Sequence, residues 1–192
     1  LLVDAERGFD NSQLLPLGPL REPLESTERA DAVIVTKSNL GNFDEVLQTI
    51  LKFKHDDCPV FRFEYRIEKI TSLDGQEEKE TFELKGKRLL LSSGIANPQS
   101  FSQLLKLEEG CPVAEMRFED HHNYSESSIR NMIEQGNKTP HDFWLTTEKD
   151  AVKLQSFQQQ LKQLWVVKMK IQPDPEWPAF FNRFLDGLSK TR

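Results

Sequence analysis

Asp120, His121 and His122 form the group of side chains in this sequence that is best suited to chemistry. A carboxylate beside imidazoles can orient a general base, pair with it or bind a metal ion. Neighbouring side chains of an extended segment point in opposite directions, so we expect only one of the two histidines to face a site. From these residues alone, catalysis, a metal-dependent phosphoesterase site and a solvated loop before a helix all stay open as interpretations.

Polar residues also follow the expected strands. In an α/β fold, ligands bind at the carboxyl ends of parallel strands, although loops are polar in most proteins whatever their function. Asn97 lies in a turn whose backbone N–H groups can hold a phosphate or simply begin a helix at Pro98. The spacing of Thr147 and Asp150 is close to that of a helix cap. The polar stretches are Asp4 to Arg7, Ser92 to Asn97, Glu119 to His122 and Thr147 to Asp150.

Arg21 and Glu22 stand between Pro19 and Pro23, in a run that begins at Leu14. Proline prevents both helix continuation and pairing in a central strand, so this proline-rich run predicts a rigid loop held in place by its leucines. A planar guanidinium fixed in such a loop is suited to bidentate contact with a phosphate or a carboxylate.

Several motifs that identify a nucleotide site or a nucleophile are missing from the sequence. It contains no GxxxxGK(S/T), GxGxxG, GxSxG or HExxH pattern. By itself the chain therefore has no recognised nucleotide cradle and no nucleophile elbow.

The composition is that of a soluble globular chain. Of its 192 residues, 37% are hydrophobic and 29% are charged, and this length can bury one full core, or one core and a small lobe. The formal net charge of −6 gives no general attraction for nucleic acid, so we expect no nucleic-acid partner. The sequence has no apolar run of about 18 residues and no signal peptide at its start. Cys58 and Cys111 belong to no CxxC pair, which favours reduced cytosolic thiols.

Apolar periodicity predicts alternating strands and helices. Ala30–Thr36 is a β-branched run typical of a buried parallel strand, and after Asn42 the apolar residues fall at helical spacing as far as Leu51. From Arg88 onward, strands and helices alternate again, which indicates an α/β fold with a mainly parallel sheet and flanking helices. Further strands are expected at 1–3, 89–92, 112–118, 142–146 and 163–167, and further helices at 101–105, around 129–133, after 147 and at 179–188.

The middle of the chain has a different character. Val60–Ile70 and Thr81–Leu91 are strand-like, and Asp74-Gly75 between them is a hairpin signal. In the first of these two stretches, apolar residues alternate with charged ones, which leaves one face of the strand buried and the other exposed to solvent. We expect a protruding two-stranded antiparallel ribbon.

Five stretches of the sequence form one ordered pattern: Val3–Phe9, Leu14–Pro23, Gly94–Pro98, Phe118–Tyr124 and Thr147–Lys153. Their order and spacing resemble tetraacyldisaccharide 4′-kinase, the lipid A 4′-kinase family of Gram-negative bacteria, over nearly the whole chain. The resemblance implies a P-loop NTPase-like fold in which the ribbon is the family's two-stranded insertion. Ala96 stands where many relatives have glycine.

The resemblance implies a kinase that uses Mg²⁺ and transfers the γ-phosphate of ATP to the 4′-hydroxyl of a tetraacyldisaccharide 1-phosphate in lipid A biosynthesis. In the family, a membrane-associated helix, the P-loop and an Asp-Asp motif precede the point where this chain begins. We therefore expect a C-terminal fragment, inactive and soluble alone, with the main ATP and Mg²⁺ elements and the membrane contact in the missing part. Its partners would be the lipid A disaccharide precursor and, peripherally, the cytoplasmic face of the bacterial inner membrane.

The resemblance also implies roles for individual residues. His121 would be the catalytic histidine that assists an acidic base, and His122 would be dispensable. Arg21 would stabilise phosphate charge, and Glu22 would orient Arg21 or help to place the metal, although no set of metal ligands is expected in this chain. The expected substrate- or cofactor-binding residues are Asn97, Asp120, Thr147, Glu148 and Lys149.

The expected segments are 1–57, the end of the N-terminal kinase core with the Arg-Glu-Pro loop; 58–91, the two-stranded ribbon or linker; and 92–192, a C-terminal α/β lobe. Two other functions stay open. One is an autonomous, non-catalytic binding or scaffold module, and the other is a metal-dependent phosphoesterase that uses Asp120 and His121.

Overall fold

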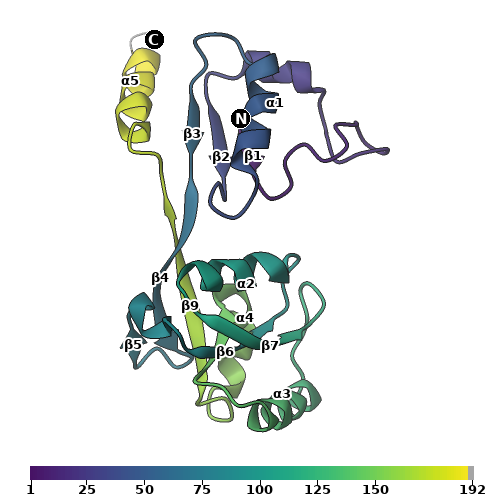
Figure 1. Cartoon of the computed structure of the whole chain (residues 1–192), viewed down its shortest axis with the longest axis vertical. Helices are drawn as coiled ribbons and strands as arrows, with labels where there is room; N and C mark the ends of the chain where they lie inside the picture. Colours follow the sequence, from purple (N-terminus) through teal and green to yellow (C-terminus); the bar gives the residue numbers. More distant parts are fainter. Residues whose placement is uncertain (190–192) are drawn as a thin grey trace. The chain divides into compact units, whose positions relative to one another are not determined.

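Two separate sheets take up the apolar runs of the sequence, and each is the centre of a different unit of the chain (Figure 1). The computed structural model describes residues 1–189. Unit 1 consists of Leu1–Tyr65 and of the chain from Ile171 onward, and unit 2 consists of Arg66–Lys170. The polypeptide passes between the units within two strands, β4 (Glu64–Ser72) and β9 (Leu164–Gln172).

Unit 1 is built on a parallel sheet of three short strands. Val33 and Val35 are completely buried, as their β-branched side chains in the sequence predict. Asp4 stands opposite Thr36 in the register, so the first two strands end at the same edge of the sheet. The strands, in sheet order, are β1 (Leu2–Asp4), β2 (Val33–Thr36) and β3 (Val60–Arg62).

Helix α1 (Phe43–Phe53) packs on this sheet and begins where the sequence predicts. Asn42 caps it by accepting a hydrogen bond of 3.3 Å from the backbone N–H of Glu45. Val46 and Ile50 are buried in the core of unit 1, whereas Leu51 is half exposed. The buried face of α1 is therefore narrower than the helical spacing of its apolar residues predicts.

Two further helices belong to unit 1, the 3₁₀ helix η1 (Leu24–Arg29) and helix α5 (Trp177–Ser189). Trp177 at the start of α5 meets Phe61 of β3 edge to face, with ring centroids 5.2 Å apart, and Phe180 adds a second ring at 5.0 Å. The closing helix expected at 179–188 is confirmed, and aromatic contacts attach it to strand β3.

Unit 2 contains a mixed six-stranded sheet with parallel central strands. Its remaining elements are β5 (Glu78–Lys79), the 3₁₀ helix η2 (Thr81–Leu84), β6 (Arg88–Ser93), α2 (Pro98–Leu107), β7 (Cys111–Arg117), α3 (Glu126–Lys138), β8 (Phe143–Thr147), α4 (Glu148–Leu154) and the 3₁₀ helix η3 (Gln155–Phe157). The strand order is β5-β4-β9-β8-β6-β7, and β7, β6, β8 and β9 are parallel. Leu89, Leu90 and Leu91 are all buried although successive residues point to opposite faces, so both faces of the sheet are covered. The expected mainly parallel sheet with flanking helices is confirmed.

A buried cluster joins the sheet of unit 2 to α3 and α4. Leu90 of β6 and Trp144 of β8 pack there with Ile129 and Met132 of α3. The indole N–H of Trp144 donates a hydrogen bond of 2.7 Å to Oγ of Ser92, so its polar atom is satisfied inside the core. This packing fixes the relative positions of β6 and β8, whose ends carry candidate residues.

The loop at 14–23 is ordered, but its leucines do not hold it. Leu15 and Leu17 are 63% and 77% exposed. Instead, the N–H of Leu15 donates to the carbonyl of Leu20 at 2.9 Å, and the N–H of Leu20 donates to the carbonyl of Gln13 at 3.1 Å. Backbone hydrogen bonds close this loop because its polar groups find partners within the turn itself.

The predicted ribbon is present as a short hairpin. β4 pairs antiparallel with β5 on the two sides of the turn at Asp74-Gly75. The first predicted arm is divided, because β3 belongs to the parallel sheet of unit 1. The second arm, 81–91, consists of η2 and most of β6, which lies between β8 and β7. Alternation predicts a half-buried strand but does not identify its neighbour.

The two units differ from the expected division into 1–57, 58–91 and 92–192. The chain from 171 onward returns to unit 1, and 58–91 is shared between the units. Contacts between distant segments produce this arrangement: the N–H of Arg62, for example, donates to the carboxylate of Asp174 at 3.2 Å.

Candidate functional site

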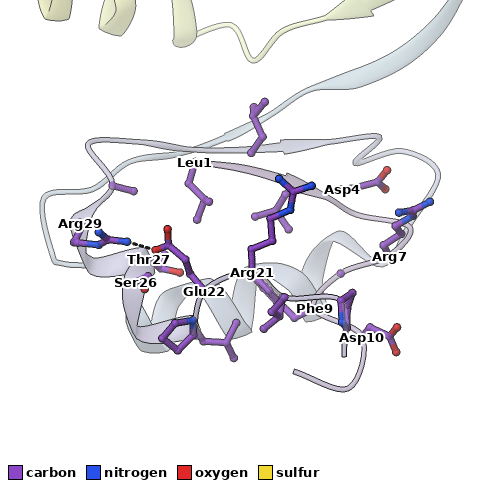
Figure 2. Close-up of a pocket in the computed structure, with 18 of the residues that line it drawn as sticks. Leu1, Asp4, Arg7, Phe9, Asp10, Arg21, Glu22, Ser26, Thr27 and Arg29 are labelled. Carbon is purple, nitrogen blue, oxygen red and sulfur yellow. Dashed lines mark hydrogen bonds and ion pairs between the residues drawn. The ribbon is translucent and has the colours of Figure 1, made fainter. Parts of the chain in front are cut away.

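An open cavity of about 1100 Å³ lies in unit 1, lined by β1, the loop after β1, residues 19–24 and η1 (Figure 2). Its lining combines leucines with three arginines, Arg7, Arg21 and Arg29, and with four acidic residues, Asp4, Glu6, Asp10 and Glu22. Anion binding in this cavity therefore depends on arginines that the acidic residues of the lining leave unpaired.

Arg21 and Glu22 both line this cavity but are engaged differently. Figure 2 shows the side chain of Arg21 extending into the cavity, and its guanidinium forms no ion pair or side-chain hydrogen bond with another residue of the described part of the chain. Glu22 forms an ion pair with Arg29 of η1. The carboxylate of Glu22 is therefore held by Arg29, and the guanidinium of Arg21 is available to a ligand.

A cation that the sequence analysis did not single out lies at the carboxyl edge of the same sheet. Lys37, the residue after β2, places Nζ 2.7 Å from Oδ2 of Asp4 and 2.9 Å from Oε2 of Glu6. Burial alone would lower the pKa of Lys37, but the two carboxylates outweigh it and raise this pKa above its usual value. The only local signal for Lys37 is its position directly after a buried strand, because Asp4 is 33 residues away.

In unit 2, three of the predicted site residues come together. Nζ of Lys149 lies 2.7 Å from Oδ1 of Asp120, and Nε2 of His121 lies 3.7 Å from Oδ2 of the same carboxylate. The hydrogen bond from Lys149, supported by the nearby His121, lowers the pKa of Asp120, so this carboxylate is ionised at neutral pH. His121 is exposed and has a φ of 62°, a left-handed conformation that costs a non-glycine residue roughly 1 kcal/mol or more. An exposed, strained histidine beside a fixed carboxylate is suited to proton transfer.

His122 has different surroundings. Its ring stacks on Phe118 with centroids 4.9 Å apart, and Tyr124 meets it edge-on at 5.0 Å. Nε2 of His122 lies 3.2 Å from Oγ of Ser128. The two adjacent histidines therefore have different surroundings, because His121 is exposed and His122 is packed among aromatic rings.

The other three predicted binding residues make contacts within the chain. Asn97 caps α2 by accepting a hydrogen bond of 3.2 Å from a backbone N–H of that helix. Thr147 is buried and caps α4 by accepting a hydrogen bond of 3.2 Å from the N–H of Asp150. Glu148 forms an ion pair of 3.2 Å with Lys168. Asn97 and Glu148 are half-buried.

Asp150 is the residue of this region that sequence reasoning anticipated least. The spacing from Thr147 identified a cap, but the carboxylate is completely buried and accepts hydrogen bonds from distant parts of the chain. Thr146 is also buried, and its hydroxyl has no hydrogen-bond partner in the described part of the chain. No local pattern predicts a partner such as Gly94, which is 56 residues from Asp150.

The chemistry available at these places is orientation, proton transfer and anion binding. Within residues 1–189, no group of three or more His, Cys, Asp or Glu side chains is arranged to hold a metal ion. No helix in the same part of the chain combines the length and the apolar character needed to cross a membrane. Unit 1 offers guanidinium groups beside leucines, and unit 2 offers a histidine beside an ionised carboxylate.

Comparison with known proteins gives one consistent result. The sequence model of a family described as tetraacyldisaccharide-1-P 4′-kinase matches residues 1–188. The chain is similar to the tetraacyldisaccharide 4′-kinase of Bdellovibrio bacteriovorus, with 31% identity over 171 residues, 89% of this chain and 50% of that protein. It is 32% identical over 192 residues to the enzyme of the same name from Xanthomonas axonopodis pv. citri, 98% of this chain and 50% of that protein. The chain therefore spans about half the length of the relatives it matches.

A solved structure shares the fold. It is the "apo" form of LpxK from Aquifex aeolicus in complex with ATP, which is similar to this chain with a TM-score of 0.60 and 25% identity. The likeness covers 93% of this chain and 49% of that one, and it confirms the expected P-loop NTPase-like fold class.

Proposed function

Because this chain belongs to the tetraacyldisaccharide-1-P 4′-kinase family, we propose that it forms part of an enzyme that transfers the γ-phosphate of ATP to the 4′-hydroxyl of tetraacyldisaccharide 1-phosphate in lipid A biosynthesis. The observation that carries the proposal is the match of the family to residues 1–188, which include every candidate residue of both units. The enzyme would be a transferase with an alcohol acceptor.

The acceptor in this proposal is an acylated sugar phosphate, so its binding site must accommodate apolar chains and negative charge together. The cavity of unit 1 has leucines in its lining and, beside them, the guanidinium of Arg21, which is unpaired within the described part of the chain. This combination supports a role in binding such a molecule. An acceptor of this kind resides in a membrane, and the same proposal therefore places the enzyme peripherally at the cytoplasmic face of the inner membrane.

His121 is assigned to the acceptor hydroxyl. Phosphoryl transfer depends on positioning the nucleophile and stabilising the charge that develops. Asp120 lies 3.7 Å from Nε2 of His121 and is held on its other side by Lys149. In this arrangement the imidazole can assist an acidic base from another part of the enzyme that takes the proton of the sugar hydroxyl.

Arg21 is assigned to the phosphate groups. Its guanidinium extends into the cavity without a partner from the described residues, so its planar set of donors remains available for bidentate contact. Glu22, paired with Arg29, would position the loop that carries Arg21.

ATP and Mg²⁺ require a phosphate cradle and oxygen ligands. The sequence has no GxxxxGK(S/T) loop, and within residues 1–189 no three acidic or metal-binding side chains converge, so these groups do not fit this chain as their main site. We therefore propose that other parts of the enzyme hold them, and that this chain supplies acceptor contacts and charge stabilisation.

Substitution of the two adjacent histidines tests the proposal. In the complete enzyme that contains this chain, His121→Ala should lower kcat for transfer of phosphate to tetraacyldisaccharide 1-phosphate by about 100-fold or more, the range of general acid–base catalysis. His122→Ala should leave kcat nearly unchanged once the melting temperature shows that the variant is folded. Equal losses of kcat would contradict the assignment of His121, and a wild-type enzyme without this activity would contradict the proposed function.

Arg21→Lys tests the phosphate contact, because it keeps the charge and loses the planar set of donors. A large loss of kcat is expected. Arg130→Lys is the matched control, because Arg130 is exposed on α3 and does not line the cavity. Wild-type kinetics for Arg21→Ala would refute the role of Arg21.

A further inference from the structure

A completely buried carboxylate lies at the edge of the unit 2 sheet where the candidate residues gather. Asp150, the third residue of α4, is 0% exposed, and no Lys or Arg of the described part of the chain forms an ion pair with it. Burying a charge is costly unless hydrogen bonds replace the lost water. The donors around Asp150 therefore indicate what this carboxylate holds together.

Three donors, each at or after the end of a different strand, reach Asp150. The backbone N–H of Gly94 lies 3.1 Å from both carboxylate oxygens. The hydroxyl of Tyr124 donates to Oδ1 at 2.9 Å, and that of Thr147 donates to Oδ2 at 2.7 Å. Gly94 follows β6, Tyr124 lies in the loop after β7, and Thr147 ends β8. Since these three strands are parallel, their carboxyl ends meet at one edge of the sheet, where the side chain of Asp150 joins the turn after β6, the loop after β7 and the last residue of β8.

The loop after β7 is the one that carries Asp120 and His121. Helix α4 holds this loop at two further points. Lys149 pairs with Asp120 at 2.7 Å, and Nζ of Lys153 donates to the carbonyl of His122 at 2.9 Å. Asp150 stands between these two lysines on the same helix, so α4 contacts the histidine loop through three of its residues.

Helix capping does not account for the contacts of Asp150. In a capping box, the acidic side chain of the third helical residue returns to the backbone N–H of the capping residue. The oxygens of Asp150 instead accept hydrogen bonds from Gly94 and Tyr124, which are 56 and 26 residues away. A Cβ on Gly94 would lie 3.0 Å from Oδ1 of Asp150 and 3.2 Å from the carbonyl of Glu119, so the turn after β6 is closely fitted to both the carboxylate and the histidine loop.

We propose that Asp150 is a positioning residue whose carboxylate fixes the loop of Asp120 and His121 against the turn after β6, and so keeps His121 in place for phosphoryl transfer. This inference rests on the function proposed above for His121. All three donors present hydrogens to the carboxylate oxygens, which replaces the hydrogen bonds to water that burial removes. Burial and the negative charge of Asp150 also raise the pKa of Tyr124, so the phenol keeps the proton that it donates.

Tyr124→Phe is the sharpest test, since it removes the O–H that ties the histidine loop and leaves the ring against Phe118 and His122. Hydrogen exchange measured on this chain should show the amides of residues 118–124 exchanging about tenfold faster, while those of α3 keep their protection. Tyr65→Phe is the matched control at the chain's other tyrosine, whose hydroxyl has no hydrogen-bond partner among the described residues, and it should change neither segment. Unchanged exchange of 118–124 in Tyr124→Phe would overturn the proposal.

A kinetic readout separates positioning from a general loss of stability. In the complete enzyme, Tyr124→Phe should lower kcat about tenfold with little change in KM for ATP, and it should cause no further loss in the His121→Ala background. A loss of the same size in both backgrounds would overturn the proposal, because Tyr124 would then act by a route other than His121. If His121→Ala alone leaves kcat unchanged, the proposed function of His121 fails, whereas the exchange measurement still decides whether Asp150 fixes the loop.

Discussion

Replacing Lys37 by methionine should destabilise unit 1 by about 2 kcal/mol. Nζ of Lys37 lies between the carboxylates of Asp4 and Glu6, at 2.7 and 2.9 Å. Removing one partner of a fully buried ion pair costs roughly 3–5 kcal/mol, whereas an exposed pair is worth about 0–1 kcal/mol. The side chains of Lys37 and Glu6 are 21% and 9% exposed, so this cluster lies between the two limits. Methionine keeps most of the length of lysine, and the left-handed backbone (φ 51°) is equally unfavourable for both residues. The substitution therefore isolates the effect of the charge.

The assay must report on unit 1 separately. Urea unfolding followed by hydrogen exchange of peptides from residues 1–65 does so. With a urea m value of about 2 kcal/mol per M, a loss of 2 kcal/mol lowers the unfolding midpoint by about 1 M. Lys85→Met is the matched control, because the Lys85–Glu109 pair has a similar distance of 2.7 Å but is 66% and 64% exposed. Because both residues of this pair belong to unit 2, the midpoint of the control is read from peptides of residues 66–170, and it should move by less than about 0.5 M.

The pH dependence of this effect has a definite sign. The folded-state pKa of Lys37 is raised, so its stabilising contribution is complete below the unfolded pKa of about 10.4 and is lost as the pH rises through the folded value. The difference in stability between the wild type and Lys37→Met should stay constant up to about pH 10 and shrink at higher pH. The reasoning is refuted if Lys37→Met lowers the midpoint no more than Lys85→Met does at neutral pH.

Three further predictions concern close packing, an exposed ion pair and ligand binding. Gly41→Ala should destabilise unit 1 by about 3 kcal/mol in the same urea assay, because the added Cβ collides with the backbone of Ala5, which no rotamer change can relieve. Hydrogen bonds from Arg88 lower the pKa of Asp142 to about 2. The stabilising effect of this carboxylate is therefore complete above about pH 4 and is lost as the pH falls through 2. The variant Asp142→Asn should remove this acid dependence from the melting temperature. Calorimetry should detect no micromolar binding of MgATP to the 192-residue chain, while circular dichroism should show a cooperative melt. A micromolar affinity would instead reveal a nucleotide site in this chain.

Local patterns predicted the elements whose formation depends on nearby residues. The β-branched run before Lys37, the cap at Asn42 and the turn before Pro98 all form as expected, because strand propensity and helix capping act over a few residues. The stretch from Thr81 to Leu91 was predicted wrongly as the second arm of a ribbon. Its first residues form a 3₁₀ helix and its last residues form a central parallel strand, since apolar content identifies burial and not the neighbouring strand.

The candidate site shows the same division between local and long-range information. By itself, the sequence identified candidate residues, among them the Asp120-His121 pair and Arg21, and an order of motifs that resembles one kinase family. Only the tertiary structure decided the partners: Lys149 reaches Asp120 across 29 residues, and Asp150 reaches Gly94 across 56. A buried polar group takes its hydrogen bonds from whichever loops the packed strands bring to it, and the packing of strands depends on the whole core rather than on any local pattern.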